Sequence, residues 1–253
     1  MNDEGPAESE THRRLETELG RLRDRAAEMG RWALGMVHDG WRAFRDHDLA
    51  LAQEVLDRDT ELDRYDQEVE HAVIAFLVTR QPAAGDLRAA TALLKATTHL
   101  DRVGRLGFDM ARITTAAEGH DVPAALLDLL DTMDGRAEAI VADALAAMQQ
   151  GDAERARALL PRDDEVDRLH REATRQIVGE LARDPTLAQR LSGTLLVARH
   201  FERISDNACK VSERTIYAAT GQRRAEYLPR HPYHPYALEG GAAGGGGTPP
   251  ANT

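Results

Sequence analysis

The second half of the chain repeats the first at a fixed offset of 104 residues. Charged residues match as well as apolar ones, since Arg58 and Asp59 correspond to Arg162 and Asp163. Matched apolar positions would show only that both halves are helical. Matched acids and arginines at constant spacing indicate instead that one supersecondary unit was duplicated. Any fold proposed for this chain must therefore contain the same unit twice.

Apolar residues recur at helical spacing through both halves, which predicts an all-α fold. Aromatic residues make up only 4% of the chain and charged residues 30%, a composition typical of long helices and unfavourable for a β-sandwich. The pattern predicts six long helices in two tandem three-helix bundles, at about 11–46, 48–80, 84–117, 122–150, 152–184 and 186–220. Pro82 suits a helix start, and Gly221 suits a left-handed helix end.

These helices divide the chain into four parts. We expect a disordered N-terminus over 1–11, a first bundle over 12–118, a second bundle over 122–222 and a disordered Pro/Gly-rich tail over 228–253. Residues 118–121 form the linker, and we expect the bundles to lie in line or slightly bent. The tail contains HPYHPY, which could bind a metal weakly. A tail without a metal site is the simpler interpretation.

Charge and cysteine content limit the function. The formal net charge is -11 and the pI about 5.4, which disfavours nucleic acid as a partner and favours cations or basic protein surfaces. Cys209 is the only cysteine, so a disulfide within the chain is impossible. Neither a secretory signal nor a membrane span is visible, so we expect a cytoplasmic protein without membrane insertion.

Carboxylates at a spacing of four residues recur in corresponding places of the two units. Asp163 and Asp167 repeat Asp59 and Asp63, and another pair, Glu202 with Asp206, lies midway along the last predicted helix. Side chains four apart share one helix face, where like charges repel unless a cation binds. Because acids are abundant, the spacing alone is weak, and a solvated acidic face remains the simpler interpretation. A metal would lie in a surface groove between helices.

Two segments resemble the PhoU family. Residues 80–88, RQPAAGDLR, are similar to that family's RQPxxxDLR hinge, and residues 195–221 are similar to its closing helix with an ERIGD core. The resemblance extends over about residues 12–222 and includes the duplication. It marks four hinge positions and the two arginines of the closing helices as binding or structural residues: Arg80, Pro82, Asp86, Arg88, Arg102 and Arg203.

The resemblance implies a regulator of phosphate homeostasis and not an enzyme. It implies negative regulation of phosphate uptake and of the phosphate-starvation response, through contacts with the ATPase of a phosphate ABC transporter and with a sensor histidine kinase. It also implies a bound divalent or iron-type metal ion, whose identity the sequence does not give. The implied ligands are Asp163, Asp167, Glu202 and Asp206 in the second unit and Asp59, Asp63 and Asp101 in the first. We expect a homodimer.

The first unit departs from the family pattern at one position. Where ERIGD ends in aspartate, this unit has Arg105. A guanidinium remains charged and removes one oxygen ligand. Our hypothesis is that Arg105 pairs with Asp59, Asp63 or Asp101 and takes the place of the ion, so that only the second unit binds metal.

Other functions have weaker support in the sequence. A ferritin-like metal oxidase needs two Glu-x-x-His motifs, and only Glu68 with His71 fits. His99 and His200 occupy equivalent positions just before the acidic motifs. Each could be a ligand or hydrogen-bond partner of the site, or an ordinary packing residue. Arg102 and Arg203 could bind phosphate or balance neighbouring acids. A helical metal-binding adaptor without a phosphate role also stays open.

Overall fold

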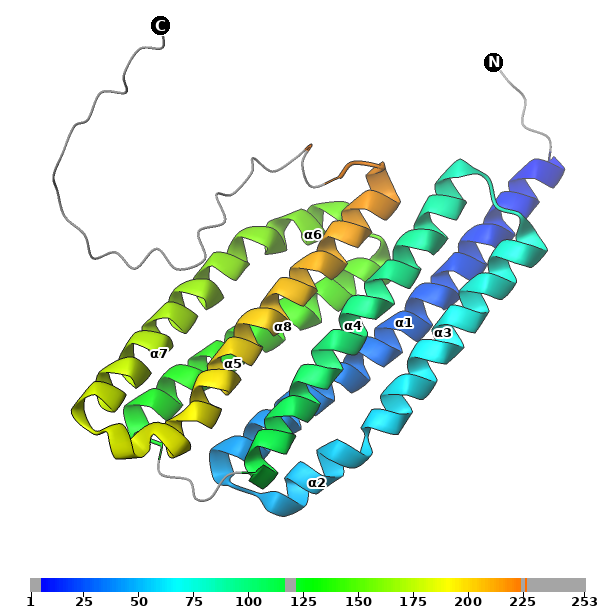
Figure 1. Cartoon of the computed structure of the whole chain (residues 1–253). Coiled ribbons are helices and arrows are strands. Elements are labelled where there is room, and N and C mark those ends of the chain that lie inside the picture. Colours follow the sequence, from blue (N-terminus) through cyan, green and yellow to red (C-terminus); the bar gives the residue numbers. More distant parts are fainter. Residues whose placement is uncertain (1–5, 117–121, 224–225, 227–253) are drawn as a thin grey trace, which may run out of the picture.

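The computed structural model of the protein describes residues 6–116, 122–223 and 226. Within these residues it is all-helical, as the apolar periodicity predicts (Figure 1). The expected linker 118–121 and tail 228–253 lie outside the described residues. The α-helices are α1 Pro6–Asp46, α2 Leu49–Asp57, α3 Asp59–Arg80, α4 Ala84–Ala116, α5 Ala124–Gln150, α6 Ala153–Leu159, α7 Asp163–Arg183 and α8 Ala188–Thr220.

The N-terminal boundary differs from our expectation. The helix α1 begins at Pro6, so residues 6–11 are helical and do not belong to a disordered N-terminus. Proline is well suited to a first helical turn, because the amide it lacks would have no partner within the helix. At the other end of the described chain, Gly221 closes α8 with φ 78°, the left-handed conformation that the sequence predicts.

The duplication is visible in the backbone between the first and second helices of each unit, before α2 and before α6. Asp48 and Asp152 both cap the following helix through their side chains, with nearly equal φ values of -86° and -84°. The preceding residues, His47 and Gly151, are both left-handed, with φ of 53° and 66°. Equal backbone conformations at the offset of 104 residues show that the repeat extends to local structure.

The second helix of each unit is interrupted, which the sequence did not predict. The expected helix 48–80 divides into α2 and α3 at Arg58, and the expected helix 152–184 divides into α6 and α7 at a 3-10 turn, Leu160–Arg162. Arg58 donates to Asp39 at 2.6 Å, and the equivalent Arg162 donates to Asp143, also at 2.6 Å. Each break therefore turns an arginine back onto the first helix of its own unit.

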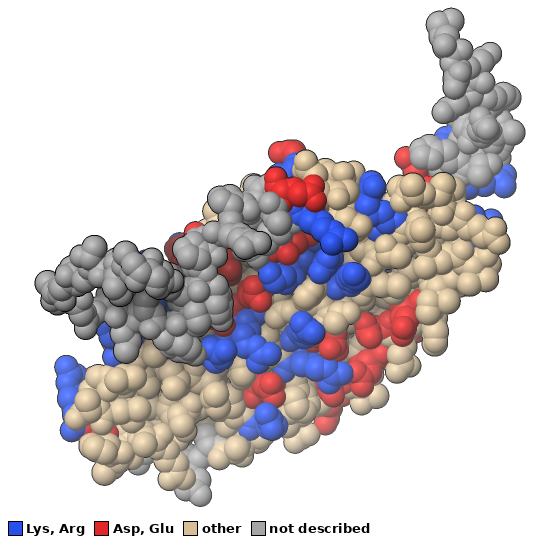
Figure 2. All heavy atoms as spheres, turned by 45° about the horizontal axis from the view of Figure 1, so that its top comes forward, with Lys and Arg blue, Asp and Glu red and all other residues tan. Residues whose placement is uncertain are grey.

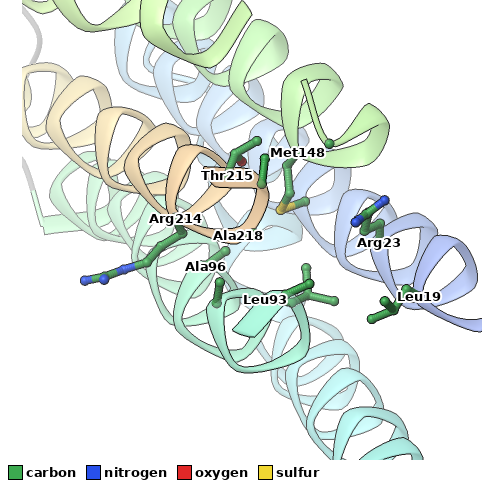
Figure 3. Close-up of a pocket in the computed structure, with 12 residues that line it drawn as sticks. Leu19, Arg23, Leu93, Ala96, Met148, Arg214, Thr215 and Ala218 are labelled. Carbon is green, nitrogen blue, oxygen red and sulfur yellow. The ribbon is translucent and has the colours of Figure 1, made fainter. Parts of the chain in front are cut away.

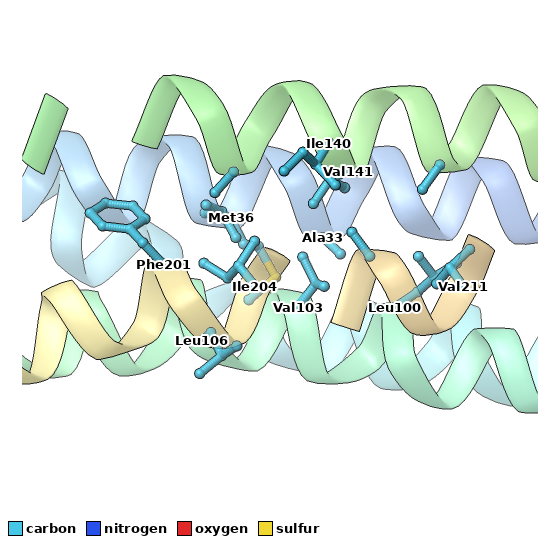
Figure 4. Packing of buried hydrophobic residues seen from close by; sticks show 14 of the residues in the cluster. Ala33, Met36, Leu100, Val103, Leu106, Ile140, Val141, Phe201, Ile204 and Val211 are labelled. Carbon is cyan, nitrogen blue, oxygen red and sulfur yellow. The ribbon is translucent and has the colours of Figure 1, made fainter. Parts of the chain in front are cut away.

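The two units lie side by side, so the expected in-line arrangement is wrong (Figure 1). The helices α1, α4, α5 and α8 pack against one another in the middle, while α3 and α7 lie at the outer edges. Buried side chains from both units, such as Met36, Val103, Ile140 and Phe201, form one continuous core (Figure 4). A single core buries more apolar surface than two separate bundles would, and this burial stabilises the side-by-side arrangement.

The first unit contains an unusually close helix contact. A Cβ atom on Gly40 of α1 would lie 2.4 Å from the carbonyl oxygen of Gly107 on α4. The equivalent positions of the second unit are Ala144 and Ala208, both buried. Larger residues at either glycine would force α1 and α4 apart.

None of the helices in the described part of the chain contains an apolar stretch long enough to cross a membrane.

Candidate metal site

In the first unit, the four residues of the acidic motif form an ion-pair network. The guanidinium of Arg105 contacts Asp59 at 3.1 Å, Asp63 at 2.5 Å and Asp101 at 3.1 Å. Burial raises the pKa of Asp101, and the charge of Arg105 opposes that shift. The arginine therefore contacts all three carboxylates that the family resemblance marks as ligands. This is the pairing that our hypothesis for Arg105 requires.

In the second unit, the corresponding carboxylates lie between α7 and α8, and Asp206 stands at the position of Arg105. Asp163, Asp167 and Glu202 are partly buried and Asp206 is exposed. Lys210 pairs with Asp206 at 3.8 Å, and the charge of Arg199 lowers the pKa of Glu202 against the burial that raises it. Burial, together with the charges of Asp167 and Asp206, raises the pKa of Asp163 to about 6, against a hydrogen bond from Ser205 that lowers it.

Ser205 is the member of this site that the sequence interpretation missed. It occupies the glycine position of the family motif, and its hydroxyl donates to Asp163 Oδ1 at 2.6 Å. The equivalent residue in the first unit, Gly104, packs against Leu62 and has no hydroxyl to offer. A serine directly before the expected ligand Asp206, where the family motif has glycine, would have been the signal for this contact.

The second-unit carboxylates fit a metal in their chemistry but not in their present arrangement. Glu202 Oε2 is buried without a hydrogen-bond partner, which is costly unless a cation or donor reaches it. Burial and the neighbouring acids Asp167, Asp206 and Asp163 raise the pKa of Glu202. However, the described residues contain no group of three or more Asp, Glu, His or Cys side chains placed to hold a metal. Binding would require these side chains to rotate.

The repeated histidines lie at the contact between the two units. His99 Nδ1 is 3.1 Å from Asn207 Oδ1, which joins α4 to α8. His200 is buried, and burial lowers its pKa to about 4, so it is neutral at neutral pH. The contact of His99 with Asn207 gives that histidine a packing role between the units.

The hinge motif has two structural roles. Arg80 ends α3 and pairs with Glu18 of α1 at 2.5 Å, and Pro82 lies in the short connection to α4. Arg88 Nε donates to the carbonyl oxygen of Ala218 on α8 at 3.2 Å, which ties the units together. Asp86 lies in the first turn of α4, where a negative charge is favourable.

Two other sequence interpretations can now be judged. Glu68 pairs with Arg64 at the surface and His71 is exposed, so the single Glu-x-x-His motif does not project into the core as a ferritin-like site requires. Arg102 and Arg203 are exposed and form no ion pair with a described carboxylate.

Comparisons with known proteins support the family resemblance. The sequence profile of the PhoU domain matches residues 26–114 and again 130–215. The phosphate-specific transport system accessory protein PhoU homolog of Rhizobium meliloti is 32% identical over 85% of this chain and 91% of its own length. The homolog from Clostridium acetobutylicum is 27% identical over 84% and 97%.

Solved structures agree with the fold. The crystal structure of PhoU from Pseudomonas aeruginosa has a TM-score of 0.76 and 28% identity, covering 82% of this chain and 99% of its own. The phosphate transport system regulatory protein PhoU from Streptococcus pneumoniae has the same TM-score of 0.76 at 20% identity, covering 83% and 98%, and this likeness shows the fold alone. With two matched domains and a side-by-side pair of three-helix units, the chain belongs to the PhoU family.

Proposed function

We propose that this protein is a negative regulator of phosphate uptake and of the phosphate-starvation response. The observation that carries the proposal is the match of both units to the PhoU domain, together with a relative of 32% identity named as an accessory protein of phosphate-specific transport. The family consists of regulatory and accessory proteins and not of enzymes. Its action is binding, through contacts with the transporter ATPase and with a sensor histidine kinase in the cytoplasm.

The fold supports a role in binding. The central helices bury a continuous core, while long polar faces of α3, α4, α7 and α8 remain at the surface. Such a rigid helical body presents fixed side chains over distances of several turns. We propose that these faces contact the transporter and the kinase, and that a second copy pairs with the first to form a homodimer.

A metal ion is a further part of this proposal. Hard cations take carboxylate oxygens, and the second-unit residues Asp163, Asp167, Glu202 and Asp206 would supply them. The unpartnered Glu202 Oε2, and the acid Asp206 at the position that Arg105 holds in the first unit, support the second unit over the first. A bound metal would relieve the repulsion between these acids and would stiffen the groove between α7 and α8.

Deletion of the gene in its host tests the regulatory role. We expect constitutive expression of phosphate-starvation genes at high phosphate, restored by the intact gene. Copurification of the phosphate transporter ATPase with the tagged protein tests the contact. Normal repression in the deletion strain, together with no recovery of the ATPase, would favour a helical adaptor without a phosphate role.

A further inference from the structure

Seven basic side chains lie along the outer side of the contact between α4 and α8. We call this surface the basic seam. It contrasts with the formal net charge of -11 of the whole chain, which would favour cations or basic surfaces as partners. The basic seam consists of Arg88, Lys95 and Arg102 from α4, and Arg199, Arg203, Lys210 and Arg214 from α8.

Helix geometry places the members from each helix on one face. Arg88, Lys95 and Arg102 are spaced by seven residues, which turns each by only about 20° from the one before. The four members from α8 are spaced by four, seven and four residues and fall within about 60° of that helix surface. Each row extends for ~20 Å at 1.5 Å per residue. The two rows therefore form one long strip.

Direct contacts bring the two rows together. Arg88 reaches the carbonyl oxygen of Ala218 across the helix contact, and His99 lies 3.1 Å from Asn207 between the rows. The charges of Arg102, Lys210 and Arg214 add to burial in lowering the pKa of His99. The charges of Arg203, Arg112 and Arg199 likewise add to burial in lowering the pKa of His200. Cations from both helices are thus close to the same side chains.

Most of these cations form no ion pair with a described carboxylate. Of the seven residues of the basic seam, only Lys210 forms ion pairs with described carboxylates, with Asp206 at 3.8 Å and Glu213 at 3.3 Å. Arg214 Nε is buried and has no hydrogen-bond partner in the described chain. By contrast, Arg105, Arg58 and Arg162 outside the seam are each bound to carboxylates. Unpaired cations held side by side repel one another, so an anionic partner would be favourable.

The shape of the charged region limits what can bind. Figure 2 shows the Lys and Arg side chains gathered in a band across the middle of this face, with Asp and Glu side chains on both sides of it. The first-unit cluster joins α3 to α4 and the second-unit cluster joins α7 to α8, so the two clusters flank the contact between α4 and α8. A wide anionic surface, such as a bilayer or a duplex of nucleic acid, would meet these acids as well as the cations.

A small anion is also a poor fit. The pocket at the end of the seam is lined by Arg23 and Arg214, but in Figure 3 the guanidinium of Arg214 points away from Arg23. The two cations do not converge on one point. The remaining lining of this pocket is largely apolar, including Leu93 and Met148.

We propose that the basic seam is a docking site for an acidic α-helix of a partner protein. A helix is about 10–12 Å wide and so can lie along the band without covering both acidic flanks. Glutamates on one face of it would pair with cations from α4 and α8 at once, and multiple such contacts set both orientation and register. The C-terminal segment of this chain is a poor candidate occupant, because residues 227–253 contain a single acid, Glu239. The inference is independent of which protein supplies the helix.

Peptide binding to the full chain tests the proposal. The probes are two labelled peptides of about 20 residues and equal composition, one with all glutamates in a single helical stripe and one with glutamates spread around the helix. Fluorescence anisotropy would measure their affinity at low and at near-physiological salt. We expect the striped peptide to bind about tenfold more tightly, with an affinity that falls as salt rises.

A matched pair of variants separates the seam from net charge. Arg102→Glu with Arg203→Glu reverses one exposed cation in each row, and we expect it to lower the affinity about tenfold or more. Arg25→Glu with Arg31→Glu on α1 changes the net charge equally at exposed residues outside the seam, and we expect about the wild-type affinity. Circular dichroism would show that both variants are folded.

Four results would overturn the proposal. These are no binding of either peptide to the wild-type chain, equal affinity for both peptides, an equal loss in the two variants, and an unchanged affinity in the seam variant. Phosphatidylglycerol vesicles and duplex DNA serve as competing probes. Binding of either one through Arg102 and Arg203, tighter than that of the striped peptide, would assign the seam to that other partner class.

Discussion

The two acidic clusters occupy equivalent places in the repeat but reach electrostatic balance differently. In the first unit Arg105 contacts Asp59, Asp63 and Asp101. In the second unit the equivalent residue is Asp206, which adds a charge of the same sign, and Asp163 instead accepts a hydrogen bond from Ser205. One substitution therefore separates a cluster with an arginine among its three carboxylates from a cluster with a fourth acid at that position. A duplicated fold can keep its geometry while the chemistry of one copy changes.

Metal binding should differ completely between the clusters. We expect Asp163→Ala to abolish binding and Asp59→Ala to leave it unchanged, because Arg105 already contacts all three carboxylates of the first cluster. The purified variants would be loaded separately with Mg, Mn, Fe, Zn and Ca, and the metal-to-protein ratio would be measured after gel filtration. Loss in Asp59→Ala with retention in Asp163→Ala would reverse the assignment.

The second unit also contains a buried acid that the first lacks. Asp134 corresponds to Gly30, and burial together with Glu138 and Asp131 raises the pKa of Asp134 to about 8, against the opposing charge of Arg45. Because this folded-state pKa exceeds the unfolded value, its contribution to stability is complete below about pH 4 and is lost as pH rises toward 8. We expect the free energy of unfolding to fall by up to about 1.4 kcal/mol per pH unit in that range.

Urea unfolding at several pH values measures this dependence. Asp134→Asn should flatten the pH profile, since an amide does not titrate. Asp128→Asn, at an exposed position of the same helix, is the control and should retain the wild-type slope. A profile that is identical in Asp134→Asn and the wild type would contradict the assignment.

Reversing the charge at position 105 should convert the first cluster into a copy of the second. We expect Arg105→Asp to destabilise the metal-free protein by about 2 kcal/mol, because three partly exposed ion pairs are lost and a fourth acid is added. Added divalent metal should recover part of that loss, which thermal unfolding with and without metal would detect.

The reciprocal change sharpens the same comparison. Asp206→Arg supplies the second cluster with a cation at the position of Arg105 and should prevent metal binding without loss of stability. If Arg105→Asp gained no response to metal, the difference between the clusters would not depend on this position.

The hydrogen bond of Ser205 should have the smallest effect. We expect Ser205→Ala to lower the free energy of unfolding by about 1 kcal/mol, because a buried carboxylate oxygen of Asp163 loses its donor. Ser212→Ala is the control, since that buried hydroxyl donates only to the carbonyl of Ala208 in its own helix. Equal unfolding midpoints for the two variants would show that the contact with Asp163 adds no stability.

Much of the candidate site could be predicted because it depends on local geometry. Asp101 and Arg105 are four residues apart on one helix, and their pairing follows from helix periodicity alone. The placement of Asp59 and Asp63 beside them follows from the short connection between α3 and α4, which makes these helices antiparallel neighbours. The contact of Ser205 with Asp163 was not predicted, because it depends on the rotation of α8 against α7 and not on spacing within either helix.

The amino-acid sequence alone was enough to predict the repeat, the helical class, the family and the presence of arginine in place of aspartate at position 105. Each of these depends on residue identity at fixed separation along one helix or between matched positions. The side-by-side packing of the units and the basic seam depend on tertiary structure. Arg102 and Arg203 lie on helices about 100 residues apart in sequence, and only the apolar core shared by α1, α4, α5 and α8 brings those helices together. Side-chain burial is nondirectional and acts over the whole surface of a helix, so spacing along the chain does not specify which helices will meet.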